Sequence, residues 1–297
     1  MITILASCTN SKTKKADETL TIKYYSKVKP FKRVIKNWKN RIEEGNSKKY
    51  ITTKLYKGVG WKATIDTYKI LSNYKRTELY IASAGYGLIS HKKEIASYNA
   101  TFAPRTPNSI GDKKDNIEWW DSINQFRVKD FSIDSYFFII LPHNYLMATQ
   151  NFIREMLEYY GKRVFIFRAT QSEVMPFMKD YIVEFDLRFN SFQTGTLSSL
   201  LSRAVVWLSK EIVTHKIPFE HHQFQKHIEN KMKDYTLYKM PKREQLLEEE
   251  LIKKIKNMII NEEITSASKG LRRLRESGIA CEQKRFSTLF KKVKGQL

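Results

Sequence analysis

A glycine-rich stretch at residues 81–89, Ile-Ala-Ser-Ala-Gly-Tyr-Gly-Leu-Ile, could form a ligand site. An apolar, β-prone run stops there at two glycines that bracket an aromatic residue. Glycine tolerates positive φ and lets a ligand approach the backbone, so Gly85 and Gly87 would leave Ser83 and Tyr86 presented at the end of a strand. Ligands bind at that edge in open α/β sheets. An ordinary strand-to-helix turn is the simpler alternative.

A second polar segment follows the first apolar run of the chain. Residues Ile2 to Ala6 predict a buried strand, and Ser-Cys-Thr-Asn-Ser-Lys follows directly. Asn10 and Ser11 offer hydrogen-bonding groups and Lys12 offers an ammonium, which together suit a phosphate or a base edge. Because no histidine is near it in sequence, Cys8 is interpreted as a small, partly buried hydrophobe rather than a nucleophile.

A third segment lacks regular periodicity and carries several groups suited to binding. It runs from Tyr98 to Asn108 and contains Tyr-Asn-Ala-Thr-Phe, followed by prolines and Arg105, which predicts a binding loop. Trp119 and Trp120 come later, directly before Asp121. Adjacent residues point in different directions on any regular element, so one tryptophan can pack in the core while the other forms a pocket wall.

Positive charge is the strongest global signal. The chain has 297 residues, a net charge of +22 and 13% aromatic residues. Its first 62 residues hold 16 Lys and Arg against 4 Asp and Glu, a net charge of +12. Cations interleaved with aromatic residues are expected where a protein tracks a phosphate backbone and stacks on bases. We therefore expect double-stranded DNA as the partner; an anionic membrane surface and a merely basic soluble protein are the alternatives.

Composition argues against several kinds of site. Two cysteines, Cys8 and Cys281, exclude a cysteine zinc site and argue against a disulfide framework. The cluster of His221, His222 and His227 is interpreted as part of a solvated linker, so we expect no metal. No Walker A or dinucleotide fingerprint is present, so no cofactor is expected. Without a run of about 18 apolar residues or a signal peptide, we expect a cytoplasmic protein with no membrane partner and no obligate protein partner.

The order of apolar runs and amphipathic segments predicts an α/β fold. Strands are expected at Ile2–Ala6, Leu79–Ser83, Tyr136–Leu141, Arg163–Arg168 and Tyr181–Phe185, and helices at Trp61–Ser72, Tyr145–Tyr160 and Leu197–Ile212. Continuous apolar strands that alternate with helices indicate a mixed or mostly parallel sheet with helices on both faces.

The C-terminal part of the chain differs in character. Residues 1–213 are predicted to form the α/β core, and the polar segment 214–240 a linker. Residues 241–297 are predicted to form a basic helical DNA-binding module with a turn at Ser277-Gly278, similar to a helix-turn-helix. A small helical cap with solvated arginines gives the same pattern.

Three motifs together resemble the YaaA-like superfamily: S-C-T-N-S-K at 7–12, S-A-G-Y-G-L at 83–88 and Y-N-A-T-F at 98–102. The likeness covers roughly the first 210 residues in motif order. That superfamily includes bacterial peroxide-stress DNA-binding proteins and is allied to the DpdA and tRNA-guanine transglycosylase-type enzymes, which modify bases. The resemblance implies work on a nucleobase in DNA, by extrusion of the base and cleavage or exchange of its glycosidic bond.

Such a reaction makes definite demands on a site. The extruded base needs stacking walls and hydrogen-bonding groups, while a cationic surface holds the backbone. Cleavage passes through an oxocarbenium-like sugar, which a carboxylate stabilises while it or an amide orients water. The resemblance implies an acidic residue just after the tyrosine of the third motif, where this chain has Asn99, so Asp121 is predicted to replace it.

Roles follow for the candidate residues. Catalysis is assigned to Asp121, with Asn10 and Asn99 orienting water or substrate. The predicted base-binding set is Cys8, Ser11, Ser83, Gly85, Tyr86, Gly87, Tyr98, Phe102 and Trp120. The predicted phosphate-binding set is Lys12, Lys14, Lys15, Arg105, Arg272, Arg273, Lys284 and Arg285.

The leading hypothesis from the sequence is a DNA glycosylase that excises a modified base from foreign DNA, such as phage DNA, and leaves an abasic site. A base-exchanging transglycosylase and a noncatalytic DNA-binding protein are the alternatives. A hydrolase needs no second substrate, a transglycosylase stalls without a free base, and a binding protein leaves the DNA covalently unchanged.

Overall fold

The chain forms two compact units, Met1–Tyr238 and Lys239–Leu297. The structure is a computed structural model, and it describes residues 1–169, 173–239 and 242–297. Each unit has a hydrophobic core of its own.

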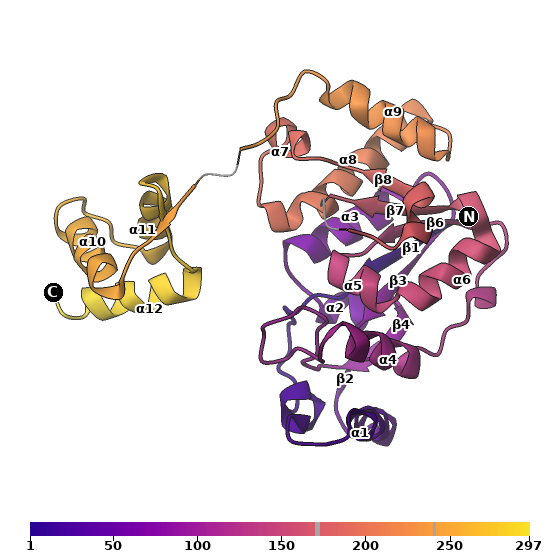
Figure 1. Cartoon of the computed structure of the whole chain (residues 1–297), viewed down its shortest axis with the longest axis horizontal. Helices are drawn as coiled ribbons and strands as arrows, with labels where there is room; N and C mark the ends of the chain where they lie inside the picture. Colours follow the sequence, from indigo (N-terminus) through magenta and orange to yellow (C-terminus); the bar gives the residue numbers. More distant parts are fainter. Residues whose placement is uncertain (170–172, 240–241) are drawn as a thin grey trace. The chain divides into compact units, whose positions relative to one another are not determined.

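A six-stranded sheet in the order β4-β3-β1-β6-β7-β8 forms the centre of the first unit (Figure 1). Its strands are β1 (Ile2–Ser7), β3 (Thr77–Ser83), β4 (Gly87–Ser90), β6 (Tyr136–Ile140), β7 (Val164–Arg168) and β8 (Ile182–Glu184). Neighbouring strands are parallel except for β3 and β4. Because parallel strands end at one edge of a sheet, the segments that follow β1, β3, β6 and β7 emerge at that edge. The predicted α/β fold with a mostly parallel sheet is confirmed.

Helices cover both faces of this sheet (Figure 1). On one face α3 (Val59–Ser72) packs against α8 (Leu200–His215), and on the other α4 (Lys113–Ile123), α5 (His143–Ala148) and α6 (Gln150–Tyr160) contact one another. The first unit also contains α1 (Phe31–Glu44), α2 (Thr52–Leu55), α7 (Arg188–Phe192) and an antiparallel pair of β2 (Lys49–Ile51) and β5 (Glu94–Ala96). Residues 2–6 of the central strand are no more than 2% exposed, as their continuous apolar run requires when both faces are covered.

The segment predicted as a linker, 214–240, belongs largely to the first unit. It contains α9 (His221–Met232), whose Phe224, Ile228 and Met232 are buried in the main core. The linker prediction is therefore wrong for these residues, because three apolar side chains at helical spacing anchor the segment despite its polar composition.

Two of the three histidines of α9, His221 and His227, are packed against the core, whereas His222 is exposed. His221 stacks on Phe165 with ring centroids 4.3 Å apart, and its Nε2 lies 2.9 Å from the carbonyl oxygen of Val164. His227 Nε2 lies 2.8 Å from a carboxylate oxygen of Glu211. Their polar atoms thus have protein partners, and within the described residues no group of three or more His, Cys, Asp and Glu side chains could hold a metal ion.

A buried hairpin turn joins β3 to β4, where the sequence predicted either a ligand site at the end of the strand or a strand-to-helix turn. The carbonyls of Ala84 and Gly85 accept hydrogen bonds from the indole N–H groups of Trp119 and Trp38, each at 2.8 Å. Both indoles are fully buried. Backbone carbonyls shielded from water need such partners, so the two tryptophans are what allows this turn to lie inside the protein.

Three helices and a short parallel strand pair make up the second unit. They are α10 (Glu248–Ile260), α11 (Ala267–Glu276), α12 (Gln283–Lys294), β9 (Glu244–Gln245) and β10 (Ile279–Ala280). Leu251, Ile255, Leu274 and Phe286 are almost fully buried in its core. An added Cβ at Gly270 would lie 3.1 Å from the Phe286 ring, so α11 and α12 pack closely at that point. The second unit therefore has the core needed to fold without contributions from the first.

We predict that Gly85→Ala destabilises the protein because its Cβ would lie 2.6 Å from a ring carbon of the buried Tyr98. Overpacking of this kind costs about 1 to 3 kcal/mol in the free energy of unfolding. Urea denaturation measures the loss. The matched control is Gly60→Ala in α3, where an added Cβ meets nothing within 4 Å and should leave stability unchanged or raise it by about 0.5 to 1 kcal/mol. Equal stability of the two variants would contradict the packing described for the turn.

Candidate functional site

A buried network of hydroxyl and thiol groups lies where β1 and β3 end. The Tyr98 hydroxyl is 2.8 Å from Ser83 Oγ and 2.9 Å from the Tyr56 hydroxyl. Cys8 Sγ is 3.1 Å from the Tyr145 hydroxyl. Burial raises the pKa of all three tyrosines well above its ordinary value, so their hydroxyls stay protonated at neutral pH. Three predicted base-binding residues, Cys8, Ser83 and Tyr98, are thus brought together, but inside the core rather than at an open surface.

Lys12 packs over this network rather than extending into solvent. Its ammonium lies 4.1 Å from the centroid of the Tyr98 ring and 5.6 Å from that of Tyr56, and it donates a 3.4 Å hydrogen bond to the Thr9 carbonyl. Burial lowers the pKa of this ammonium. The predicted phosphate contact of Lys12 therefore has no support in its position, since the charge sits against two aromatic faces.

A cavity of about 430 Å³ adjoins this region at the carboxyl edge of the sheet. Its walls come from the loop that contains Phe102, from the beginning of α4, from α5, which follows β6, and from residues 173–175. The lining residues are Phe102, Pro104, Gly111, Asp112, Lys113, Asn116, His143, Asn144, Met147, Ala148, Glu173, Val174 and Met175. This volume falls within the range of pockets that hold small organic ligands.

Two polar side chains of this cavity have unmet hydrogen-bonding capacity. In the described part of the chain, the buried atoms Asn116 Oδ1 and His143 Nδ1 have no hydrogen-bond partner. Asn116 is only 9% exposed. A buried polar atom without a partner costs about 1 to 3 kcal/mol, and native proteins contain few of them. Both residues line the cavity, but these two atoms are themselves closed off from solvent, so a ligand reaches them only after the side chains rotate toward the cavity.

The imidazole of His143 is held in its neutral form. Burial lowers its pKa, and the positive charges of Arg168 and Lys113 lower it further. At neutral pH one ring nitrogen can therefore donate a hydrogen bond and the other can accept one.

Phe102 connects the cavity to the hydroxyl network behind it. Its ring lines the cavity and meets the Tyr145 ring edge to face, with centroids 5.0 Å apart. Trp120 also meets the Phe102 ring edge to face, with ring centroids 6.4 Å apart. Trp120 is 1% exposed and does not line the cavity, so it supports Phe102 rather than forming the pocket wall predicted for it.

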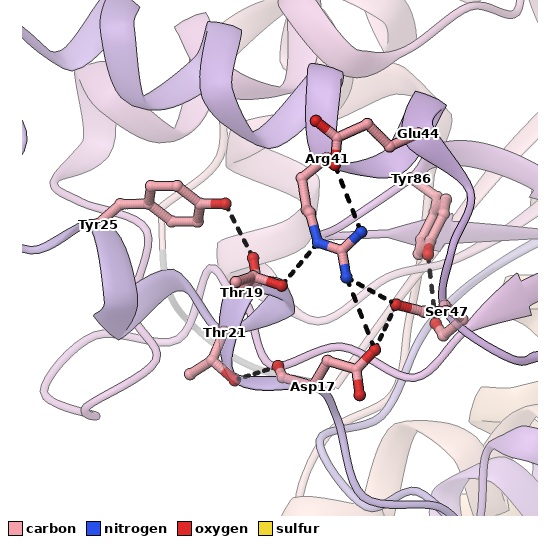
Figure 2. A network of polar contacts seen from close by, with 9 residues as sticks. Asp17, Thr19, Thr21, Tyr25, Arg41, Glu44, Ser47 and Tyr86 are labelled. Carbon is pink, nitrogen blue, oxygen red and sulfur yellow. Dashed lines mark hydrogen bonds and ion pairs between the residues drawn. The ribbon is translucent and has the colours of Figure 1, made fainter.

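Tyr86 occupies a different cavity, so it cannot stack on the same ligand as Phe102. It lines a hollow of about 270 Å³ beside α1, and its hydroxyl donates to the Ala96 carbonyl at 3.4 Å. Figure 2 shows Tyr86 next to the polar contacts of Arg41. Burial raises the pKa of Tyr86 to about 12. The predicted base-binding residues therefore divide between two places.

The two predicted asparagines also lie apart from the cavity. Asn99 Nδ2 donates to Thr21 Oγ1 at 3.2 Å, and its backbone pairs with Leu20 and Ile22, so it ties the chain before α1 to the core. Asn10 is exposed and its side chain has no polar partner among the described residues. Neither position supports the predicted role in orienting water within the cavity.

Asp121 faces away from the cavity. It lies five positions after Asn116 on α4, which places it about 140° around the helix axis from Asn116. Its Oδ2 accepts a 2.7 Å hydrogen bond from Asn151 on α6. Although the residue is exposed overall, partial burial of the carboxyl raises its pKa. The predicted catalytic carboxylate is therefore not one that lines the pocket.

Two other carboxylates do line the cavity. Asp112 is the N-cap of α4, where its Oδ1 accepts a 2.9 Å hydrogen bond from the Asp115 amide. Glu173 is exposed and has no polar partner among residues 1–169, 173–239 and 242–297. Sequence reasoning missed both, together with Asn116 and His143. A signal was present for His143, which comes directly after the predicted strand at 136–141 and its proline.

The remaining predicted phosphate ligands are mostly exposed. Lys14, Lys15 and Arg105 lie at the surface of the first unit, as does Ser11, which was predicted to bind the base. In the second unit, Arg272, Arg273 and Arg285 form ion pairs with Glu276, Glu262 and Glu248, and Lys284 is exposed. A groove of about 550 Å³ in this unit is lined by Arg243, Arg272 and Arg275.

No protein-family model, curated protein or solved structure gives a significant match to this chain. In the part of the chain that the structure describes, no helix is both long and apolar enough to cross a bilayer.

We predict that the His143 imidazole titrates below the ordinary value of about 6.5. As the pH falls through 6.5, the unfolded chain binds this proton before the folded protein does, so stability decreases toward acid pH. His143→Gln should remove the part of this decrease in stability that His143 causes. Burial also lowers the pKa values of His91 and His221, but these two histidines contribute equally in the wild-type and variant proteins. NMR titration of His143 and urea denaturation between pH 7.5 and 5 check this; an unshifted titration would contradict it.

Proposed function

We propose that the protein is a DNA glycosylase that takes an extruded nucleobase into the cavity formed by Phe102, Asn116 and His143. The observation that carries this proposal is the cavity itself. It lies at the carboxyl edge of the sheet and combines an aromatic wall with two buried side chains whose polar atoms lack partners. A flipped base needs both a stacking surface and hydrogen bonds to its edge.

The cavity has room for a base that carries an added substituent. Its volume of about 430 Å³ lies within the range of pockets that hold drug-sized ligands, which are larger than a nucleobase. Modified bases of this kind in foreign DNA, such as phage DNA, are the proposed substrate.

Each lining residue has a role in the proposed reaction. Phe102, which is 1% exposed, closes the inner end of the cavity behind the base, and Asn116 with the neutral His143 holds the polar edge of the base. Glu173 stabilises the positive charge that develops on the sugar as the glycosidic bond breaks. The electron pair of the glycosidic bond leaves with the base, and water bonds to the sugar as Asp112 accepts a proton from it through the oxygen that does not cap α4. The departing base takes up one proton, so the two parts of the water molecule end on the sugar and on the base. The products are a free base and an abasic site.

The +22 charge of the chain supports a DNA partner. Incubation of the purified protein with ordinary and base-modified DNAs tests the proposal, with released bases measured by mass spectrometry and abasic sites by alkaline cleavage. Base release without any added free base is the expected result. Release only when a free base is supplied would indicate base exchange instead, and DNA that is bound but unchanged would contradict catalysis.

We predict that Glu173→Gln slows base release while Asp121→Asn does not. Loss of one preorganised electrostatic group costs about 2 to 4 kcal/mol of transition-state stabilisation, or about 30- to 1000-fold in rate. Asp121→Asn is the matched change on the far side of α4 and should stay within about twofold of wild type. Single-turnover assays measure both rates. The reverse order of effects would return catalysis to Asp121.

We predict that removal of residues 239–297 weakens DNA binding but leaves base release measurable at low salt. The first unit keeps its entire core in such a truncation, whereas the second holds 15 Lys and Arg against 8 Asp and Glu. For the full chain, about 6 phosphate contacts give a slope near −5 for log affinity against log salt. A truncated protein that binds DNA but releases no base would contradict the assignment of chemistry to the first unit.

A further inference from the structure

Helix α1 has a lysine stripe beside its buried face. Val34, Ile35 and Trp38 point into the core. Lys32, Lys36 and Lys39 follow one another at spacings of four and three residues, which places them on one side of the helix. A solvated face is the ordinary interpretation of such a stripe, so a binding role needs further support.

The stripe lines a groove of about 520 Å³ between α1 and α4, to which α4 contributes Glu118 and Ser122. Glu43 of α1 also lines it. Over the described ranges of the chain, no carboxylate oxygen lies within the 4.0 Å ion-pair distance of any of the three lysine nitrogens. The three ammonium groups are thus left unneutralised although two glutamates are close by.

The inner side of α1 is fixed to the core. Trp38 donates its indole hydrogen bond to the β3–β4 turn, and its ring lies 5.5 Å from that of Trp119 on α4. The lysine stripe therefore keeps a constant position relative to α4.

The C-terminal end of α1 is fixed by Arg41 (Figure 2). Its guanidinium donates to Thr19 Oγ1 at 2.6 Å and to Ser47 Oγ at 3.1 Å. Carboxylate oxygens of Asp17 and Glu44 lie 3.9 and 3.5 Å away. A cationic surface that is held in place loses less conformational freedom on binding than a mobile one.

We propose that Lys32, Lys36 and Lys39 hold the phosphate backbone of the DNA strand whose base enters the cavity. The stripe spans about 10 Å along the helix, at 1.5 Å per residue. One DNA strand rises about 3.4 Å per nucleotide, so about 10 Å corresponds to roughly three steps, which four consecutive phosphates span, and each of the three ammonium groups can reach one of these phosphates. The glutamates of the groove repel a strand that is shifted sideways, which restricts its path to the stripe.

The choice of this strand rests on the proposed function. The groove uses Glu118 and Ser122 of α4, whereas the cavity uses Asn116 on a different face of the same helix. At 3.6 residues per turn, Glu118 and Ser122 lie about 160° and 120° around the axis of α4 from Asn116. A strand that reaches both the groove and the cavity therefore runs around α4 rather than straight across it.

The test compares two triple variants in the full chain. The first is Lys32→Gln, Lys36→Gln and Lys39→Gln. The control is Lys62→Gln, Lys69→Gln and Lys226→Gln, which removes the same charge from three exposed lysines on α3 and α9. Affinity for a labelled DNA duplex is measured by fluorescence anisotropy across a salt series, with melting temperatures to show that both variants fold.

The α1 triple should reduce the magnitude of the salt slope by about 3, since each lost phosphate contact contributes about 0.9. The control triple should change it by less than about 1. Equal slopes for the two triples would overturn the proposal, whether or not base release occurs. If the salt slope decreases in the α1 triple variant but not in the control, phosphate binding by the lysine stripe is supported even if no DNA releases a base. The test of the groove is therefore independent of the test of the glycosylase function.

Discussion

The two indole hydrogen bonds from Trp38 and Trp119 to the β3–β4 turn determine how the elements around the site are arranged. They satisfy the carbonyls of Ala84 and Gly85 inside the protein. They also draw α1 and α4 onto the end of β3. Gly85 is required because any side chain there would enter the Tyr98 ring. One buried turn thus fixes the helix that carries the lysine stripe and the helix that carries Asn116.

The region behind the cavity and the cavity itself differ in their hydrogen bonding. The hydroxyls of Tyr56, Tyr98 and Tyr145 all have partners, and their raised pKa values keep them neutral, so this region acts as a rigid support. Asn116 and His143 line the adjoining cavity with polar atoms that lack partners. A ligand is therefore expected in front of Phe102, rather than among the tyrosines behind it.

Local pattern predicted the sheet but not the site. The runs at Ile2–Ala6 and Tyr136–Leu141 specify buried strands because their apolar character is continuous. Ser83 and Tyr98 both lie in motifs that the sequence singled out. The burial of the turn after Ser83, however, depends on Trp119 and Trp38, which lie 35 and 47 residues from the carbonyls that they bind. Asn116 could not be found from the sequence, because it is singled out by a side-chain oxygen that has no hydrogen-bond partner in the folded structure. Asp121 was predicted to be catalytic because it follows two tryptophans in the sequence, whereas its position on α4 places its side chain on the face of the helix away from the cavity.

The central claim is that a nucleobase enters the cavity at the carboxyl edge of the sheet. The most direct measurement is a crystal structure of the protein with a DNA duplex in which the excised nucleotide, identified from the released base, carries a 2′-fluorinated sugar that resists cleavage. We expect the base to lie in the cavity in front of Phe102, with its polar edge within hydrogen-bond distance of Asn116 and His143. A base found beside Tyr86, or still stacked in the duplex, would contradict it.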